Sequence, residues 1–179
     1  MINAIQKKKE INKYLCHSFS DSGINVDVDS KLTTAEYIGV KVDDYYNAIL
    51  PMIAPKSVDF IITVDCSCNS YVLYILEFKN LKKPKSLHIN EIHEKFDTTV
   101  NDFIKSRFKD IFLNDRFKYK KVLLYLVSDI YNEVGKTSHH VRDSLKVDTN
   151  LAAKLYKIKG IITSIQYDIP PNPLIKKYT

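Results

Sequence analysis

VDFIITVDCSCNSYVLYILEFKN, residues 58–80, consists of two apolar runs separated by a short polar turn. Runs rich in β-branched and aromatic residues on either side of such a turn are typical of a β-hairpin. The second run is apolar at every position from 72 to 76, which indicates a strand that is covered on both faces. Three ionisable residues stand out from this background: Asp59 near the start of the first run, and Glu77 and Lys79 at the end of the second.

The expected register brings these three residues together. A turn over residues 66–70, centred on Cys68, places Asp59 directly opposite Glu77. Opposed residues of an antiparallel pair point to the same side of the sheet, and Lys79, two residues further on, shares that side. A turn one residue longer or shorter would change this register. The hairpin is therefore expected to present two carboxylates and one ammonium group on a single patch.

Two carboxylates in such a position point to a metal site. Like charges that face each other on a sheet are unfavourable, and in a partly dry cleft one of the two acids has its pKa raised. A divalent cation removes the conflict, and Mg²⁺, with Mn²⁺ as a substitute, prefers one or two carboxylates together with water and phosphate oxygens. Lys79 would orient the attacking water or offset charge on the phosphate. The set is chemically complete for hydrolysis of a phosphodiester.

Asp59, followed on the next strand by Glu77-Phe78-Lys79, resembles the motif of the PD-(D/E)xK nuclease superfamily, which has the restriction-endonuclease-like fold. The resemblance covers residues 35–127 and departs from the motif at Val58, where proline is usual. It implies that Asp59 and Glu77 bind the metal and that Lys79 assists catalysis. Many members also carry an acid on the helix before the hairpin. The candidate for that position is Glu36, with Asp43 or Asp44 as the fallback.

The periodicity of apolar residues predicts the other elements. Helical spacing predicts four helices, over residues 2–19, 34–50, 89–111 (with Ser86 as a cap) and 149–158 (with Thr149 as a cap). Apolar runs predict a buried strand over 120–129, a strand over 161–167 and a short strand at 24–28.

This order of elements predicts the fold class. A strand, a long helix and another strand imply a right-handed crossover that joins parallel neighbours. The expected fold is therefore α/β: a mixed β-sheet with a central antiparallel hairpin and a parallel crossover strand, flanked by helices. The chain is expected to form a single domain over 1–179, with its core at about 34–128 and a C-terminal helix, strand and tail at 149–179.

Composition narrows the class of protein. The chain has 179 residues, 45% of them hydrophobic, and a formal net charge of +6, which suits a globular domain with a phosphate-bearing partner. No apolar run is long enough to span a bilayer and the N-terminus has no signal-like apolar region, so a cytoplasmic location is expected. The three cysteines, two of them in a C-x-C turn, predict reduced thiols, with zinc binding as the weaker alternative.

Two hypotheses follow. In the first, the protein is a Mg²⁺-dependent endonuclease of restriction, repair, junction-resolving or toxin type that cuts DNA in preference to RNA and acts as a homodimer. Its predicted nucleic-acid contacts are the lysines that follow the hairpin and two basic residues in the 131–144 loop: Lys82, Lys83, Lys85, Lys136 and Arg142. In the second, the same fold is a non-catalytic module that binds nucleic acid or protein.

Other candidate site residues have weaker support from the sequence. Asp65 lies beside the turn, where a carboxylate stabilises the turn rather than joining Glu77. The pairs His88/His93 and His139/His140 leave a histidine base open, but their spacing predicts surface or loop positions. The sequence contains no serine–histidine or cysteine–histidine nucleophile pattern and no glycine-rich nucleotide-binding motif.

Overall fold

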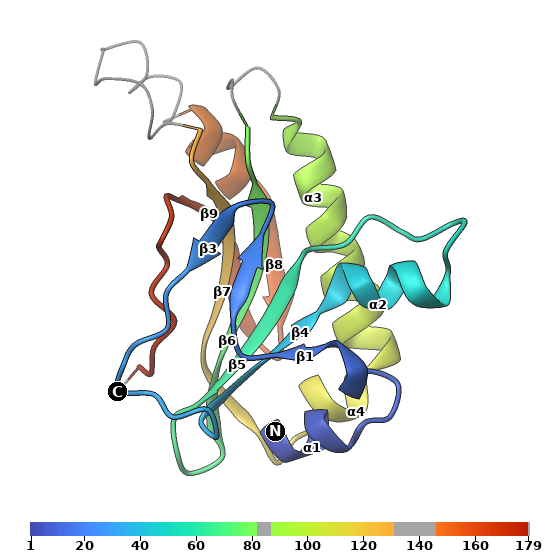
Figure 1. The fold of residues 1–179 in the computed structure, drawn as a ribbon, viewed down its shortest axis with the longest axis vertical. Helices are drawn as coiled ribbons and strands as arrows, with labels where there is room; N and C mark the ends of the chain where they lie inside the picture. Colours follow the sequence, from blue (N-terminus) through green and yellow to red (C-terminus); the bar gives the residue numbers. More distant parts are fainter. Residues whose placement is uncertain (82–86, 131–145, 179) are drawn as a thin grey trace.

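A computed structural model describes residues 1–81, 87–130 and 146–178 (Figure 1). Its centre is a seven-stranded mixed sheet. The strands follow one another across the sheet in the order β1 (Leu15–Cys16), β4 (Tyr37–Lys41), β5 (Phe60–Asp65), β6 (Ser70–Lys79), β7 (Lys118–Ser128), β9 (Ile161–Asp168) and β8 (Leu155–Ile158). The prediction of a mixed α/β fold is confirmed at this level.

The predicted hairpin is β5 and β6, and its register is the predicted one. Phe60 pairs with Leu76 and Asp65 pairs with Tyr71, so the ladder runs toward the Asp59 and Glu77 positions. Asp65 Oδ1 accepts a hydrogen bond of 2.7 Å from the Ser67 amide, which confirms a turn-stabilising role for Asp65.

The predicted parallel crossover is also present. β6 and β7 pair in parallel, and the connection between them is helical. That connection contains α3 (Ile89–Thr98), the π-helical segment η3 (Thr99–Arg107) and α4 (Lys109–Phe112). The expected helix over 89–111 is therefore confirmed in extent, although nine of its residues are π-helical. Ser86, the expected cap, lies outside the described residues.

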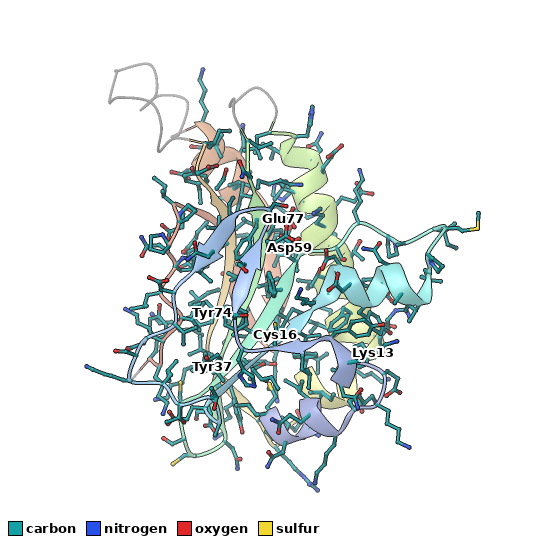
Figure 2. All side chains as sticks on the ribbon, in the orientation of Figure 1. Lys13, Cys16, Tyr37, Asp59, Tyr74 and Glu77 are labelled. Atoms are coloured by element: carbon teal, nitrogen blue, oxygen red, sulfur yellow. The ribbon has the colours of Figure 1, made fainter. Side chains whose placement is uncertain are left out.

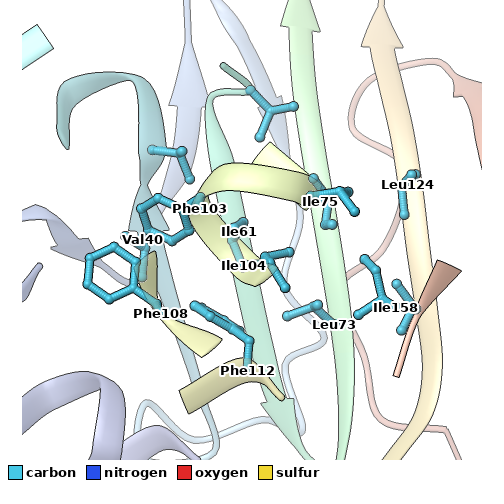
Figure 3. Packing of buried hydrophobic residues seen from close by; sticks show 14 of the residues in the cluster. Val40, Ile61, Leu73, Ile75, Phe103, Ile104, Phe108, Phe112, Leu124 and Ile158 are labelled. Atoms are coloured by element: carbon cyan, nitrogen blue, oxygen red, sulfur yellow. The ribbon is translucent and has the colours of Figure 1, made fainter. Parts of the chain in front are cut away.

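The helices cover one face of the sheet. α1 (Ile2–Lys7), α2 (Val42–Ile49), α3, α4 and the helix at 146–152 all contribute to one hydrophobic cluster on that face. In Figure 3, Phe103, Ile104 and Phe112 pack over Leu73 and Ile75. Because side chains alternate along β6, the next position on this face after Leu73 and Ile75 is Glu77.

The opposite face has a different cover. The small hairpin of β2 (Phe19–Asp21) and β3 (Ile24–Val26) lies over it, together with the C-terminal segment around Ile175. These segments pack on the even-numbered residues of the central hairpin, such as Ile62 and Tyr74. Within the described part of the chain, the expectation that helices flank the sheet is therefore met on one face only. Among the described residues, no helix is both long enough and apolar enough to cross a membrane.

Three predicted helices differ from the structure. Residues 2–19 form α1, a short 3-10 turn η1 (Asn12–Tyr14) and strands β1 and β2, because their apolar residues are divided between the two faces of the sheet. Residues 149–158 fall in the helix at 146–152 and in β8, where Tyr156 and Ile158 are buried and Leu155 is exposed, an alternation of period two.

The third difference changes which acidic residue of segment 34–50 reaches the site. The expected helix at 34–50 begins with β4, and only residues from Val42 onward form α2. β4 lies between β1 and β5, so its residues 37–40 are buried on both faces. Gly39 allows this packing, because a Cβ atom there would lie 2.3 Å from the Phe19 ring. The apolar residues of a strand buried on both faces also satisfied the helical spacing.

Candidate active site

Asp59 and Glu77 lie on the helix-covered side of the sheet, at the end remote from the hairpin turn (Figure 2). Glu77 is in β6 and has no exposed surface, and Asp59, directly before β5, is 7% exposed. Charged residues are rarely this buried without compensation. The sequence prediction that these two acids come together on one face agrees with the geometry.

The position of Asp59 is fixed by contacts to three elements. Its Oδ2 atom accepts a hydrogen bond of 2.6 Å from the Phe78 amide of β6. Its carbonyl accepts one of 3.0 Å from the Val42 amide at the start of α2. The preceding amide, that of Val58, donates to Thr99 Oγ1 at 3.2 Å. The Asp59 carboxylate is therefore held against the strand that carries Glu77.

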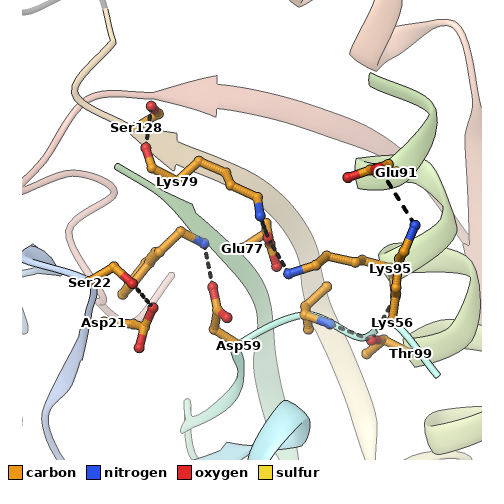
Figure 4. A network of polar contacts seen from close by, with 12 residues as sticks. Asp21, Ser22, Lys56, Asp59, Glu77, Lys79, Glu91, Lys95, Thr99 and Ser128 are labelled. Atoms are coloured by element: carbon orange, nitrogen blue, oxygen red, sulfur yellow. Dashed lines mark hydrogen bonds and ion pairs between the residues drawn. The ribbon is translucent and has the colours of Figure 1, made fainter. Parts of the chain in front are cut away.

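One carboxylate oxygen of Glu77 forms ion pairs with two lysines. Lys95 Nζ lies 2.6 Å from Glu77 Oε1, and Lys79 Nζ lies 3.2 Å from the same atom (Figure 4). The second oxygen, Oε2, is buried and has no hydrogen-bond partner among the described residues. A buried acceptor without a partner is costly, and such atoms are typical of sites that receive a ligand.

Burial and mutual repulsion shape the protonation of the acids. Burial, followed by the charge of Glu77, raises the pKa of Asp59 to about 8. Burial also raises the pKa of Glu77, and Lys95 and Lys79 only partly oppose this shift. Two neighbouring acids repel each other when both are ionised, and a divalent cation bound between them removes this repulsion.

A third acid, Asp43, lies in the first turn of α2. Burial raises the pKa of Asp43, and its charge also acts on Asp59 and on Lys95. Asp43 is thus the acid that the helix before the hairpin brings to the site. Asp44, the other fallback, pairs with Lys41 at 3.5 Å instead.

Glu36 is not brought to the site. It lies in the turn before β4, where its carboxylate accepts the Thr33 amide at 2.8 Å and pairs with Lys177. Its carbonyl accepts from the Asp65 amide, at the turn end of the hairpin. The expectation for Glu36 assumed a helix over 34–50, and the strand β4 places this residue at the wrong end of the sheet.

A cavity of about 260 Å³ lies beside Asp43 and Lys95. Asp43 and Lys95 line it, together with residues of α2 and of the segment that enters β5: Asn47, Ala54, Pro55, Lys56 and Ser57. Lys95 is the functional candidate that the sequence analysis missed. Its only sequence signal was a charged position on a helix whose other face is apolar, which many surface lysines share.

The remaining predicted residues divide into two groups. Lys82, Lys83, Lys85, Lys136 and Arg142 lie outside the described residues, as do His139 and His140. His93 is engaged elsewhere, since its ring nitrogens lie 3.1 Å from the Tyr156 hydroxyl and 3.2 Å from the Asn150 carbonyl. The three cysteines are free thiols.

The acids fit a cation that keeps part of its water shell. Over residues 1–81, 87–130 and 146–178, no three histidine, cysteine or acidic side chains stand close enough to form a ligand set. A cation at Asp59 and Glu77 would therefore take its other ligands from water and substrate, which is how Mg²⁺ is usually held. Comparisons with protein-family models, curated proteins and solved structures find no match for this chain.

Proposed function

We propose that this protein is a divalent-metal-dependent nuclease that hydrolyses phosphodiester bonds of DNA. The observation that supports this proposal most directly is the buried Oε2 atom of Glu77, which finds no partner in the described structure, on a carboxylate whose charge also acts on the buried Asp59. Two such acids with two lysines match the needs of phosphodiester hydrolysis, where oxygen ligands hold a cation and ammonium groups offset charge on the phosphate.

Each residue has a defined role in this proposal. Asp59 and Glu77 hold Mg²⁺, or Mn²⁺ in its place, and the Phe78 amide keeps Asp59 oriented toward the site. When bound, the cation lowers the pKa of a coordinated water and polarises the phosphate. Lys79 is 32% exposed, so its ammonium group reaches both Glu77 and solvent, where it orients water or stabilises developing negative charge.

The preference for nucleic acid rests on charge and on the resemblance. The net charge of +6 favours a polyanionic partner, and the motif Asp59…Glu77-Phe78-Lys79 resembles that of DNA-cutting enzymes. The homodimer remains a prediction from the size of the chain.

The test is cleavage of supercoiled plasmid with Mg²⁺, followed on gels, for the wild type, Glu77→Gln and Lys79→Met. We expect nicking or linearisation that EDTA abolishes and that each substitution reduces by at least about a hundredfold. Glu10→Gln, which changes an exposed glutamate, is the matched control and should cut like the wild type. A duplex RNA of the same sequence tests the preference for DNA.

Two results would contradict the proposal. One is DNA binding without cleavage that is equal in all variants, which would favour the non-catalytic module. The other is cleavage that survives both Glu77→Gln and EDTA, because it would come from another site or from a contaminant.

A further inference from the structure

Lys95 forms the shortest ion pair with Glu77, although it lies outside the strand motif. Its Nζ atom is 0.6 Å nearer to Glu77 Oε1 than that of Lys79, at 2.6 against 3.2 Å. Its side chain is also the less exposed of the two, at 19% against 32%. A lysine that reaches from α3 into the acid cluster therefore provides the main charge compensation for Glu77.

Lys95 is close to two of the acids: its Nζ atom lies 2.6 Å from Glu77 Oε1, and its side chain lines a cavity together with Asp43. Burial alone would lower the pKa of Lys95, but the charges of Glu77, Asp59 and Asp43 outweigh burial and raise it. These carboxylates come from three elements, β6, the start of β5 and α2. Lys95 thus already neutralises part of the negative charge that would attract a cation.

A cation and the Lys95 ammonium group are therefore competitors. Both are attracted by the same carboxylates, and two positive charges that share Glu77 would repel each other. Lysine has a flexible four-carbon stem, so its ammonium group can move while its backbone stays in α3. The cavity of about 260 Å³ that Lys95 itself lines offers the space for this movement.

We propose that Lys95 takes the place of the cation as the partner of Glu77 in the metal-free protein, and that it exchanges this contact for the phosphate of the bound nucleic acid when the cation binds. The inference rests on the proposed function. It assigns to Lys95 two successive contacts, first with carboxylate and then with phosphate, and both are contacts that an ammonium group makes readily.

The first test measures metal binding alone. Titration with Mn²⁺ at pH 8, followed by electron paramagnetic resonance without nucleic acid, compares the wild type with Lys95→Met and Lys95→Gln. Because a competing positive charge has been removed, we expect the variants to bind Mn²⁺ with a dissociation constant at least about tenfold lower. Lys105→Met, a change on η3 where the exposed lysine donates a hydrogen bond to Asn101, is the control and should bind like the wild type.

The second test measures the contact with phosphate. DNA binding is measured across a salt series in Ca²⁺ and again in EDTA. Since each phosphate contact contributes about 0.9 to the slope of log affinity against log salt, Lys95→Met should lower the slope by about 0.9 in Ca²⁺ and leave it unchanged in EDTA. Lys95→Gln can still hydrogen-bond to Glu77 and should show the same decrease in slope. It replaces Lys95→Met in this test if Lys95→Met folds poorly.

The outcomes separate the two proposals. A wild type that cuts DNA, with Lys95 variants that bind Mn²⁺ no more tightly and keep the full salt slope, overturns the exchange and leaves the nuclease standing. Equal slope losses in Ca²⁺ and EDTA also overturn it, because Lys95 would then bind phosphate without leaving Glu77. A wild type that neither binds Mn²⁺ nor cuts nucleic acid overturns both.

Discussion

Replacing Asp59 by asparagine should stabilise the metal-free protein. The carboxylate is 7% exposed and faces Glu77, and these surroundings raise its pKa to about 8 from an ordinary value of 3.8. Folding at neutral pH must therefore either protonate Asp59 or bury its charge, and both cost free energy. Asparagine has nearly the same shape, and its side-chain oxygen can still accept the hydrogen bond from the Phe78 amide.

The size of the effect follows from linkage. A carboxyl whose pKa is raised on folding binds more protons in the folded state, so its unfavourable contribution grows as pH rises above the unfolded pKa and levels off above the folded one. At pH 7 about three units separate the pH from the ordinary pKa, and each unit is worth about 1.4 kcal/mol. The upper limit is thus about 4 kcal/mol, and we expect Asp59→Asn to raise the free energy of unfolding by about 2–4 kcal/mol.

The assay is urea and thermal unfolding in EDTA at several pH values from 4 to 8. For a chain of this length the expected gain corresponds to an increase in Tm of about 5–10 °C at pH 7, which should shrink on acidification and vanish near pH 4. Asp115→Asn, at an exposed turn residue, is the control and should show no such gain. With Mn²⁺ added, only the wild type should gain stability. A variant that is destabilised at pH 7, or equally stabilised at every pH, would refute the reasoning.

Three further substitutions probe the site and its support. Lys79→Met should lower the cleavage rate by about 10²–10³ while Mn²⁺ binding, measured by titration, persists, since Lys79 is a partner of the carboxylate and not a ligand. Thr99→Val should cost about 1–3 kcal/mol in urea unfolding and weaken Mn²⁺ binding, because the buried Val58 amide beside Asp59 loses its acceptor; unchanged binding would show that this bond does not position the acid. Gly39→Ala should cost about 1–3 kcal/mol without a pH dependence, because its methyl group would meet the Phe19 ring at 2.3 Å, and a neutral result would mean that the small hairpin shifts freely.

The hairpin could be predicted from the sequence because its signals are local. The polar turn, the apolar runs of β5 and β6 and the parity of their residues determine which side chains share a face. The crossover to β7 followed from a long amphipathic pattern between two strands. Asp59, Glu77 and Lys79 lie in these strands or directly beside them, so the centre of the site could be predicted from the sequence pattern alone.

The rest of the site depends on packing between distant segments. Lys95 meets Glu77 across 18 positions of sequence because α3 lies on the same face as Glu77. Asp43 comes near Asp59 because β4 ends at Lys41 and α2 begins at the same end of the sheet as Asp59. Residues 34–50 carry apolar side chains at a spacing that suits both a helix and a doubly covered strand, so the boundary that selects Asp43 over Glu36 is invisible to periodicity.

Burial together with the balance of charge distinguishes this site from the exposed ion pairs of the described residues. Exposed pairs such as Asp97–Lys154 and Asp102–Arg107 match one acid with one base at the surface, where such pairs contribute little. Glu77 pairs with both Lys95 and Lys79, the charges of Asp59 and Asp43 also act on Lys95, and the acids Asp59 and Glu77 are almost fully buried. With its acids ionised, that group carries an excess negative charge in surroundings that solvate it poorly, and a net charge left in a dry site is strongly unfavourable. A purely structural ion-pair cluster would be more stable with one acid fewer, whereas a site that binds a cation needs this excess.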